Sequence, residues 1–374
     1  MLKKLVIILF LTVGIGLTVF YFLQDTAKTK KTFFRNGHLQ SEISYLNGKK
    51  NGISRYYYEN GTLRLEIPYK DNRIDGIFRQ YFQNGTLMVE YTRHNDMTEG
   101  ELKEYYDTGV LKYEEHYLND LLTGIAKEYY PSGILKQETL YQDGLRNGTE
   151  KIYYETGQLK ELYSYKNDKL EGISLTYSKS GALKTEAPYV NNTINGTLKM
   201  FYDTKGLQAE FPYINGKING IAAEYDLDGN KIATYTYQNG IKHGSAKAFD
   251  KNGTLLIEMN YEHGKINGVL KEYFKNGKIH SEIPYIDNQK QGIAKVYTEN
   301  GNLAKEVSFK DNKFHGIAKS YSNTGQIITE LIFSNGIIEN GFSYQQGEKK
   351  PLSEKEIAKI RMLKDVLFYE ESSK

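Results

Sequence analysis

A glycine recurs every 24 residues through most of the chain, and this period constrains the fold more than any other feature of the sequence. With Gly37 taken as repeat position 0, glycine fills this position in twelve of thirteen steps up to Gly325, and Lys205 is the exception. A second glycine fills position 15 in every complete repeat from Gly52 to Gly316. One repeated unit therefore replaces the two or three domains that 374 residues would otherwise suggest. The structural repeat glycines of the first repeats are Gly37, Gly52, Gly61, Gly76, Gly85, Gly100, Gly109, Gly124, Gly133 and Gly148.

Two aromatic positions alternate with the glycines. Position 8 is Tyr or Phe except at Arg93, and position 20 is aromatic in every repeat. The segments between turn residues have seven or eight residues, which suits strands and is too short for typical helices. Both faces of such a ribbon carry apolar side chains, so the units must stack on their neighbours. The candidate interaction aromatics at position 20 are Tyr57, Tyr81, Tyr105, Tyr129, Tyr153, Tyr177, Phe201, Tyr225, Phe249, Tyr273, Tyr297 and Tyr321.

The turn residues predict that each repeat is one hairpin. Pairs such as Asn60-Gly61 and Asn276-Gly277 favour two-residue type I′ turns, because both central residues of that turn need positive φ. A second polar turn, such as Asn47-Gly48, follows position 8. We therefore expect an all-β fold, an elongated sheet of tandem 24-residue β-hairpins.

The hairpin register can be checked within the sequence itself. If Asn60 and Gly61 form a two-residue turn, Arg55 lies opposite Glu66. The same geometry places Lys or Arg opposite Glu in nine of twelve hairpins. Such pairs contribute about 0.2–1 kcal/mol each and disfavour slipped registers; a charged ladder that binds a ligand is the functional alternative. The three hairpins that depart are Lys151/Leu162, Leu175/Glu186 and Ala223/Thr234.

Proline interrupts this register at one repeated position. Four of the six prolines occupy position 7, where continued pairing with position 16 would need a backbone donor that proline lacks. We expect the pairing to end or bulge there, next to the position 15 glycine, and the sheet to bend once per repeat. The four residues are Pro68, Pro188, Pro212 and Pro284.

The unit N-G-x-L-x-x-E-x-x-Y followed by N-G-x-x-K-E-Y-Y resembles the variant MORN repeat, which is also seen in proteins labelled as YwqK-type antitoxins. The resemblance covers residues 37–344 in twelve full units and one degenerate unit, in which Asn340-Gly341 comes one residue late. It implies tandem hairpins and a role in protein or membrane interaction. The family motif contains no catalytic residue, so the resemblance implies none here.

The N-terminus has a different composition. Residues 1–4 form a short tail with Lys3 and Lys4, and residues 5–23 carry no charge over a length that can span a bilayer as a helix. No small-x-small cleavage site follows, so an uncleaved signal anchor is expected rather than a secretory signal peptide. Residues 24–36 are a linker and first half-unit. The lysines after residue 23 favour the cytoplasm for the repeats, whereas a short tail before a long body favours the extracytoplasmic side. We expect the extracytoplasmic side.

The C-terminal residues 345–374 are predicted to form an amphipathic helix. Ser353 and Glu356 form a capping box after Pro351, and apolar residues follow at three- and four-residue steps. The expected role is a short capping helix that covers the open edge of the last hairpin. A helix that docks a partner is the alternative.

Composition argues against enzyme chemistry. The chain has no Cys and no Trp, and its net charge of +3 gives no concentrated basic surface for nucleic acid. Its seven histidines are scattered over the repeat, so no catalytic, cofactor-binding or metal site is predicted. We expect a non-enzymatic, membrane-anchored repeat scaffold that mediates protein–protein interaction at the bacterial cell envelope. The alternatives are a cell-wall or glycan-binding repeat module, and an antitoxin-like protein that neutralises a toxin by binding it.

Overall fold

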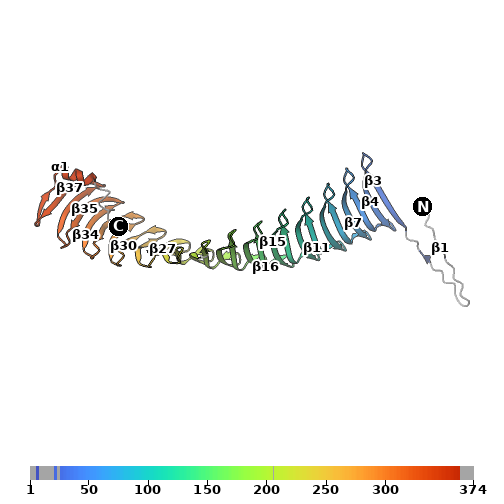
Figure 1. Cartoon of the computed structure of the whole chain (residues 1–374), viewed down its shortest axis with the longest axis horizontal. Coiled ribbons are helices and arrows are strands. Elements are labelled where there is room, and N and C mark those ends of the chain that lie inside the picture. Colours follow the sequence, from blue (N-terminus) through green and yellow to red (C-terminus); the bar gives the residue numbers. More distant parts are fainter. Residues whose placement is uncertain (1–5, 8–20, 23–25, 205, 363–374) are drawn as a thin grey trace. The chain divides into compact units, whose positions relative to one another are not determined.

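The computed structural model describes residues 6–7, 21–22, 26–204 and 206–362. The chain divides into two compact units, Met1–Gly172 and Ile173–Lys374. Each unit is built from antiparallel strands in which every hairpin pairs with the next one along the chain (Figure 1). The predicted all-β tandem hairpin sheet is confirmed, as is one short helix near the C-terminus.

The first unit begins with two short strands, β1 (Val6–Ile7) and β2 (Tyr21–Phe22), which pair antiparallel. Apart from these four residues, the predicted membrane segment 5–23 lies outside the described residues. No helix in the described part of the chain has the length and apolar character needed to span a membrane. The remaining strands are β3 (Ala27–Phe33), β4 (Leu39–Leu46), β5 (Lys49–Lys50), β6 (Gly52–Tyr57), β7 (Leu63–Lys70), β8 (Arg73–Ile74), β9 (Gly76–Tyr81), β10 (Leu87–His94), β11 (Met97–Tyr105), β12 (Leu111–Leu118), β13 (Leu121–Leu122), β14 (Gly124–Tyr129), β15 (Leu135–Gln142), β16 (Leu145–Tyr153), β17 (Leu159–Lys166) and β18 (Lys169–Leu170).

The second unit continues the same repeat and ends with a helix. Its strands are β19 (Gly172–Tyr177), which contains the boundary, β20 (Leu183–Val190), β21 (Thr193–Ile194), β22 (Gly196–Phe201), β23 (Leu207–Ile214), β24 (Lys217–Ile218), β25 (Gly220–Tyr225), β26 (Lys231–Gln238), β27 (Ile241–Phe249), β28 (Leu255–Glu262), β29 (Lys265–Ile266), β30 (Gly268–Tyr273), β31 (Ile279–Ile286), β32 (Gln289–Lys290), β33 (Gly292–Tyr297), β34 (Leu303–Lys310), β35 (Lys313–Tyr321), β36 (Ile327–Ser334), β37 (Ile337–Gln345) and β38 (Glu348–Pro351). The helix α1 spans Glu354–Met362, and residues 363–374 lie outside the described residues.

The turn at repeat position 0 differs from the prediction. Only Gly61 has positive φ, at 90°, whereas Asn60 does not. The amide of Gly61 donates to Tyr58 O at 2.9 Å, and that of Tyr58 donates to Thr62 O at 2.8 Å. This is a type I turn followed by a left-handed glycine, so the predicted two-residue type I′ turn is wrong here. A bulge in β7, where Arg64 is the extra residue opposite Tyr56 and Tyr57, then restores the predicted register.

Type I′ geometry occurs instead at the second turn of each repeat. Asn47 and Gly48 have φ of 51° and 82°, and the flanking residues Leu46 and Lys49 face each other. Asn and Asp tolerate the left-handed region because their short side chains bond locally, which explains the Asn/Asp/Gly composition of these turns.

The position 7 prolines lie at a pairing break, but on the other side of the strand from the one expected. Pro68 stays opposite Ile53 within its hairpin. On its other edge the carbonyl of Pro68 accepts the amide of Asp75 at 3.1 Å, and regular pairing is interrupted between Ile74 and Arg79. In an antiparallel sheet, the N–H and C=O of one residue point to the same neighbouring strand. The backbone nitrogen of Pro68, which has no hydrogen to donate, therefore faces the interrupted segment between Ile74 and Arg79, where regular pairing requires no donor.

Polar turn residues join each repeat to the next. The side-chain oxygen of Asn72 accepts the amide of Lys50 at 2.7 Å, and Asp120 accepts the amide of Thr98 at the same distance. The hydroxyl of Tyr58 donates to the carbonyl of Tyr81 at 2.8 Å. Because these bonds recur at the repeat spacing, the sequence period is also a hydrogen-bonding period between hairpins.

The two faces of the sheet differ in packing. Side chains at position 17 point to one face, which we call the packed face. In several repeats they are small and buried, and Ser54 and Ala222 are 0% exposed. Larger side chains from neighbouring strands cover them, as in the cluster of Ala294, Val307 and Phe309. Single-layer hairpins thus build a narrow core that runs from repeat to repeat.

The C-terminal helix closes the packed face of the last hairpins. Glu356 bonds the amide of Ser353 at 2.8 Å, as the capping box predicts. Ile357 is buried against Leu331, Phe333 and Ile338. The helix covers this face rather than the edge of the last hairpin, because β38 pairs with β37 and takes the edge position.

We predict that Gly196→Ala destabilises the protein more than the matched change Gly181→Ala. Both glycines have positive φ, of 123° and 83°, which costs an L-residue about 1–2 kcal/mol. A Cβ at Gly196 would also lie 2.8 Å from Cγ of Pro188, whereas one at Gly181 meets nothing within 4 Å. The overlap should add about 1–3 kcal/mol. Urea unfolding followed by circular dichroism checks this, and equal losses would contradict it.

Candidate functional site

The face opposite the packed one, which we call the exposed face, carries three parallel rows of side chains. Successive residues of a strand point to opposite faces, so Ile53, Arg55 and Tyr57 share this face while Ser54 lies on the other. Each repeat contributes the same three positions, 16, 18 and 20. The exposed face is therefore the candidate functional site, and its three rows are described in turn.

The middle row, which we call the charge row, alternates Lys or Arg with Glu from strand to strand. All nine opposite-charge pairs predicted within hairpins are in register, as Arg55 is with Glu66. Arg55 Nε lies 2.9 Å from Glu66 Oε1. Arg79 then lies opposite Glu66 from the next hairpin, at 3.9 Å. Each of these cations thus stands between two glutamates.

Pairing between hairpins also explains two of the departures from the sequence pattern. Lys151 faces Leu162 in its own hairpin but lies 2.6 Å from Glu138 of the preceding hairpin. Glu186 likewise bonds Lys199 of the following hairpin at 3.1 Å. Both contacts join neighbouring hairpins, so the residue pattern within one hairpin does not predict them.

The position 20 aromatics form the second row, which we call the aromatic row, and all twelve are half-buried. Several tyrosine hydroxyls donate to the glutamate of the preceding hairpin; Tyr225 bonds Glu210 and Tyr321 bonds Glu306, both at 2.6 Å. Burial, with the bond to the carboxylate, raises the pKa of Tyr225, Tyr297 and Tyr321 to about 12. Their hydroxyls therefore support the charge row, and their rings lie beside it.

The third row is apolar in eight of its twelve positions, and we call these eight residues the isoleucine row. They are between 44% and 63% exposed, and they were not among the predicted site residues. Position 16 is polar in the other four repeats, which carry Glu101, Thr149, Thr197 and Ser245. Strand alternation was the signal that could have found the isoleucine row, since position 16 shares a face with the charged position 18. In the first unit these residues are Ile53, Ile77 and Ile125, and in the second they are Ile173, Ile221, Val269, Ile293 and Ile317.

The described residues contain no group of three His, Asp or Glu side chains arranged to hold a metal ion. His243 and His263 contact each other edge to face at 5.5 Å, and the sequence had placed them at different repeat positions. The exposed face thus offers apolar contact and balanced charge, with tyrosine rings along one side.

We predict that Tyr321 titrates late because it is partly buried and bonds Glu306. The folded state keeps this proton up to about pH 12, whereas an unfolded tyrosine loses it near its ordinary pKa of 10. The folded state therefore binds more protons between these values, and stability falls as pH rises through that window. In a ¹³Cζ-tyrosine titration, Tyr321→Phe should remove one late resonance, and Glu306→Gln should move it toward pH 10. A Tyr321 resonance that Glu306→Gln leaves unchanged would contradict the assignment.

Comparison with known proteins places these repeats in a family. The family model described as MORN repeat variant matches more than half of the chain, in eleven segments. The matched residues are 29–47, 50–71, 74–95, 98–119, 122–143, 146–167, 170–191, 242–263, 266–287, 290–311 and 314–335. Residues 192–241 are not matched, yet their strands keep the hairpin register, as Gly220 opposite Tyr237 shows.

No curated protein matches the chain. Among solved structures, TcdB2-TccC3-TEV is 11% identical with a TM-score of 0.16, over 88% of this chain and 20% of that one. TcdB2-TccC3 without its hypervariable C-terminal region is 13% identical with a TM-score of 0.16, over 84% and 22%. A porin-like protein from Bacteroides uniformis is 10% identical with a TM-score of 0.18, over 67% and 92%. The chain spans about a fifth of the length of the first two. On its eleven matched repeats, the chain belongs to the MORN repeat variant family.

Proposed function

We propose that this chain is a non-enzymatic repeat scaffold that holds a protein partner on its exposed face. The isoleucine row carries the proposal, since all eight of its members are between 44% and 63% exposed on the same face. Single exposed apolar residues are common on soluble proteins, whereas aligned ones are typical of interaction surfaces. Two strands per repeat, each about 4.8 Å from the next, space these contacts about 10 Å apart where consecutive repeats carry them and about 20 Å apart where a polar residue intervenes.

The neighbouring charge row supports a protein as the partner. Cations and anions alternate along it, so it offers no concentrated positive surface for nucleic acid or anionic lipid. An alternating row complements a protein surface of mixed charge and fixes the register of docking, more than it adds affinity.

The aromatic row bears on the glycan-binding alternative. Carbohydrate recognition by aromatic repeats uses ring faces that are open to the ligand. The position 20 rings are half-buried, and hydroxyls such as that of Tyr297 are bonded to glutamate, here Glu282 at 2.9 Å. This geometry supports the protein-binding proposal, in which the tyrosines stabilise the surface and contribute its flank.

Membrane anchoring forms a second part of the proposal. Residues 5–23 carry no charge, and a helix of that length spans a bilayer. We propose that this segment anchors the chain, with the repeats on the extracytoplasmic side at the cell envelope. A reporter fused after Lys374 tests the orientation. A cytoplasmic signal would contradict the envelope location and favour the antitoxin-like alternative.

Serine substitutions on the isoleucine row should weaken partner binding. Ile53, Ile77 and Ile125 are changed together in the full chain, because all three are exposed in the first unit. A partner captured by cross-linking in cells is purified, and its affinity for each variant is measured. We expect a loss of at least about tenfold, since a few central apolar contacts dominate most interfaces.

The matched control changes Leu118, Leu121 and Leu145 to serine. These residues are also exposed, by 52%, 49% and 42%, but flank the second turns instead of lying on the isoleucine row. The control should leave affinity within about twofold of the unchanged chain. Equal losses in both variants would contradict the proposed surface, and retention on purified cell wall without a protein partner would favour the glycan-binding alternative.

A further inference from the structure

We propose that the outer edge of β3 (Ala27–Phe33) accepts an acidic extended segment of a partner protein as an added strand. The inference rests on the proposed scaffold function and names a second contact for it, at the start of the repeat array. It is carried by the backbone groups of β3, by the register of the interior repeats and by three exposed lysines.

Within the described residues, β3 pairs with β4 alone. The carbonyl of Thr26 accepts the amide of Asn47 at 3.1 Å, and the amide of Phe34 donates to His38 O at 2.8 Å, so both ends of the strand bond toward β4. Backbone groups alternate sides along a strand. The N–H and C=O groups of Ala27, Thr29 and Lys31 therefore point away from β4 and form an edge that can pair with another chain.

The interior repeats dictate how an added strand would pair. Strand β6 lies one repeat after β3, and there Arg55 faces Glu42 and Tyr56 faces Ser41 of the preceding strand. The amide of Asn51 also donates to Ser44 O at 3.0 Å. The residues of β3 that occupy the same repeat positions, 24 residues earlier, are Lys31 in place of Arg55 and Ala27 in place of Asn51.

The partner segment is thereby specified at two positions. It places an acidic residue opposite Lys31, and the carbonyl two residues later accepts the amide of Ala27. Most interior hairpins carry glutamate at the first of these positions. Lys31 presents the matching cation at the edge, and the acidic residue of the partner would complete the ion pair.

The charge of the edge favours an acidic partner over a second copy of this chain. Lys28, Lys30 and Lys31 are exposed, and Lys31 has one carboxylate beside it, Glu42 at 3.1 Å. Interior cations such as Arg79 have two. Two β3 edges would oppose lysine with lysine, and β38, at the other end of the described strands, carries two lysines and Pro351.

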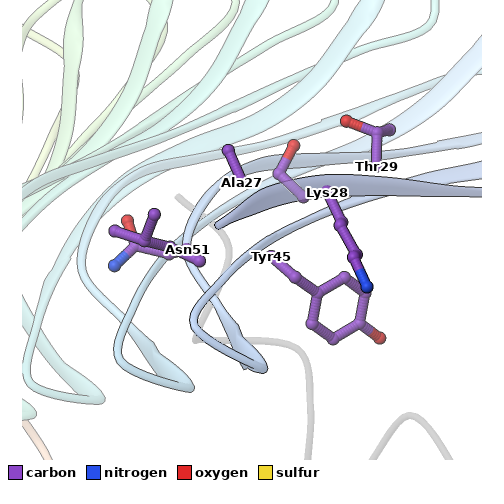
Figure 2. Close-up of a pocket in the computed structure, with 7 residues that line it drawn as sticks. Ala27, Lys28, Thr29, Tyr45 and Asn51 are labelled. Carbon is purple, nitrogen blue, oxygen red and sulfur yellow. The ribbon is translucent and has the colours of Figure 1, made fainter. Parts of the chain in front are cut away.

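A shallow cavity of about 310 Å³ adjoins this edge. Figure 2 shows Lys28 and Tyr45 extending to the same side of the β3–β4 pair, with Asn51 nearby. Side chains of an added strand alternate between the two faces, so one of them can enter this cavity while its neighbour faces Lys31. The cavity thus gives the edge a side-chain contact in addition to backbone pairing, as β-strand addition sites commonly have.

The test uses a fluorescent peptide that copies residues 279–288, a first strand with Glu282 at the acidic position and Asp287 as a further carboxylate. Its binding to the full chain in detergent micelles is followed by anisotropy. Ala27→Pro removes the outward N–H that the partner carbonyl would accept, without removing a bond to β4, and should weaken binding at least about tenfold. Lys31→Glu should weaken binding about tenfold and should reverse the preference, so that a peptide with Glu282→Lys binds it better than the original peptide does.

Circular dichroism establishes that both variants keep the sheet. The isoleucine-row variant should bind the peptide normally, so failure of the edge and failure of the exposed face are separate results. Absence of binding, binding that Ala27→Pro leaves unchanged, or no reversal with Lys31→Glu would each overturn the proposal. Self-association of the chain that Ala27→Pro removes would place a second copy on the edge and also overturn it.

Discussion

The register between strands is the constraint on which the rest of the structure depends. A shift of one residue would move every side chain to the other face. The register is held by backbone positions with positive φ, at Gly61 in the first turn, at Asn47 and Gly48 in the second, and at the position 15 glycines. Because these positions recur every 24 residues, the isoleucine row, the charge row and the aromatic row at position 20 each stay aligned within a unit.

Much of this fold could be predicted from the sequence. The period predicted the hairpins, and the opposite charges predicted their register, because both are local properties of one repeat. The turn type was wrong, since a three-residue turn and the bulge after it together give the same register at Arg55 and Glu66 as a two-residue turn would. Sequence spacing alone does not distinguish these two geometries.

Features that depend on neighbouring hairpins were harder to predict. The contact between Lys151 and Glu138 and the bond from Tyr321 to Glu306 both join different hairpins, so a single hairpin contains no sign of them. The position 20 aromatics were chosen as candidate interaction residues by their recurrence, and whether they contact a partner stays a prediction. The structure adds that the hydroxyls of several of these tyrosines are bonded within the sheet, while the isoleucine row on the other side of the charge row is more open to solvent.

The proposed scaffold separates the packing of the sheet from its surfaces for partners. Small buried residues and the C-terminal helix occupy the packed face, which leaves the exposed face and the β3 edge for partners. Balanced charge along the exposed face favours a protein over a polyanion. Such a surface requires side chains at the same repeat position to lie on the same face in consecutive repeats of a unit. The glycines with positive φ hold the register that places them there.

The assignment of the two faces is the central claim, and thiol labelling tests it most directly. The chain has no cysteine, so single substitutions report one site each. Neighbouring pairs are compared in each unit: Ile53→Cys with Ser54→Cys, and Ile221→Cys with Ala222→Cys. The isoleucine sites are 46% and 63% exposed and their neighbours 0%, so we expect rapid modification of the first member of each pair and protection of the second until the protein is unfolded. Equal labelling within the pairs, or faster labelling at residues 54 and 222, would contradict the account.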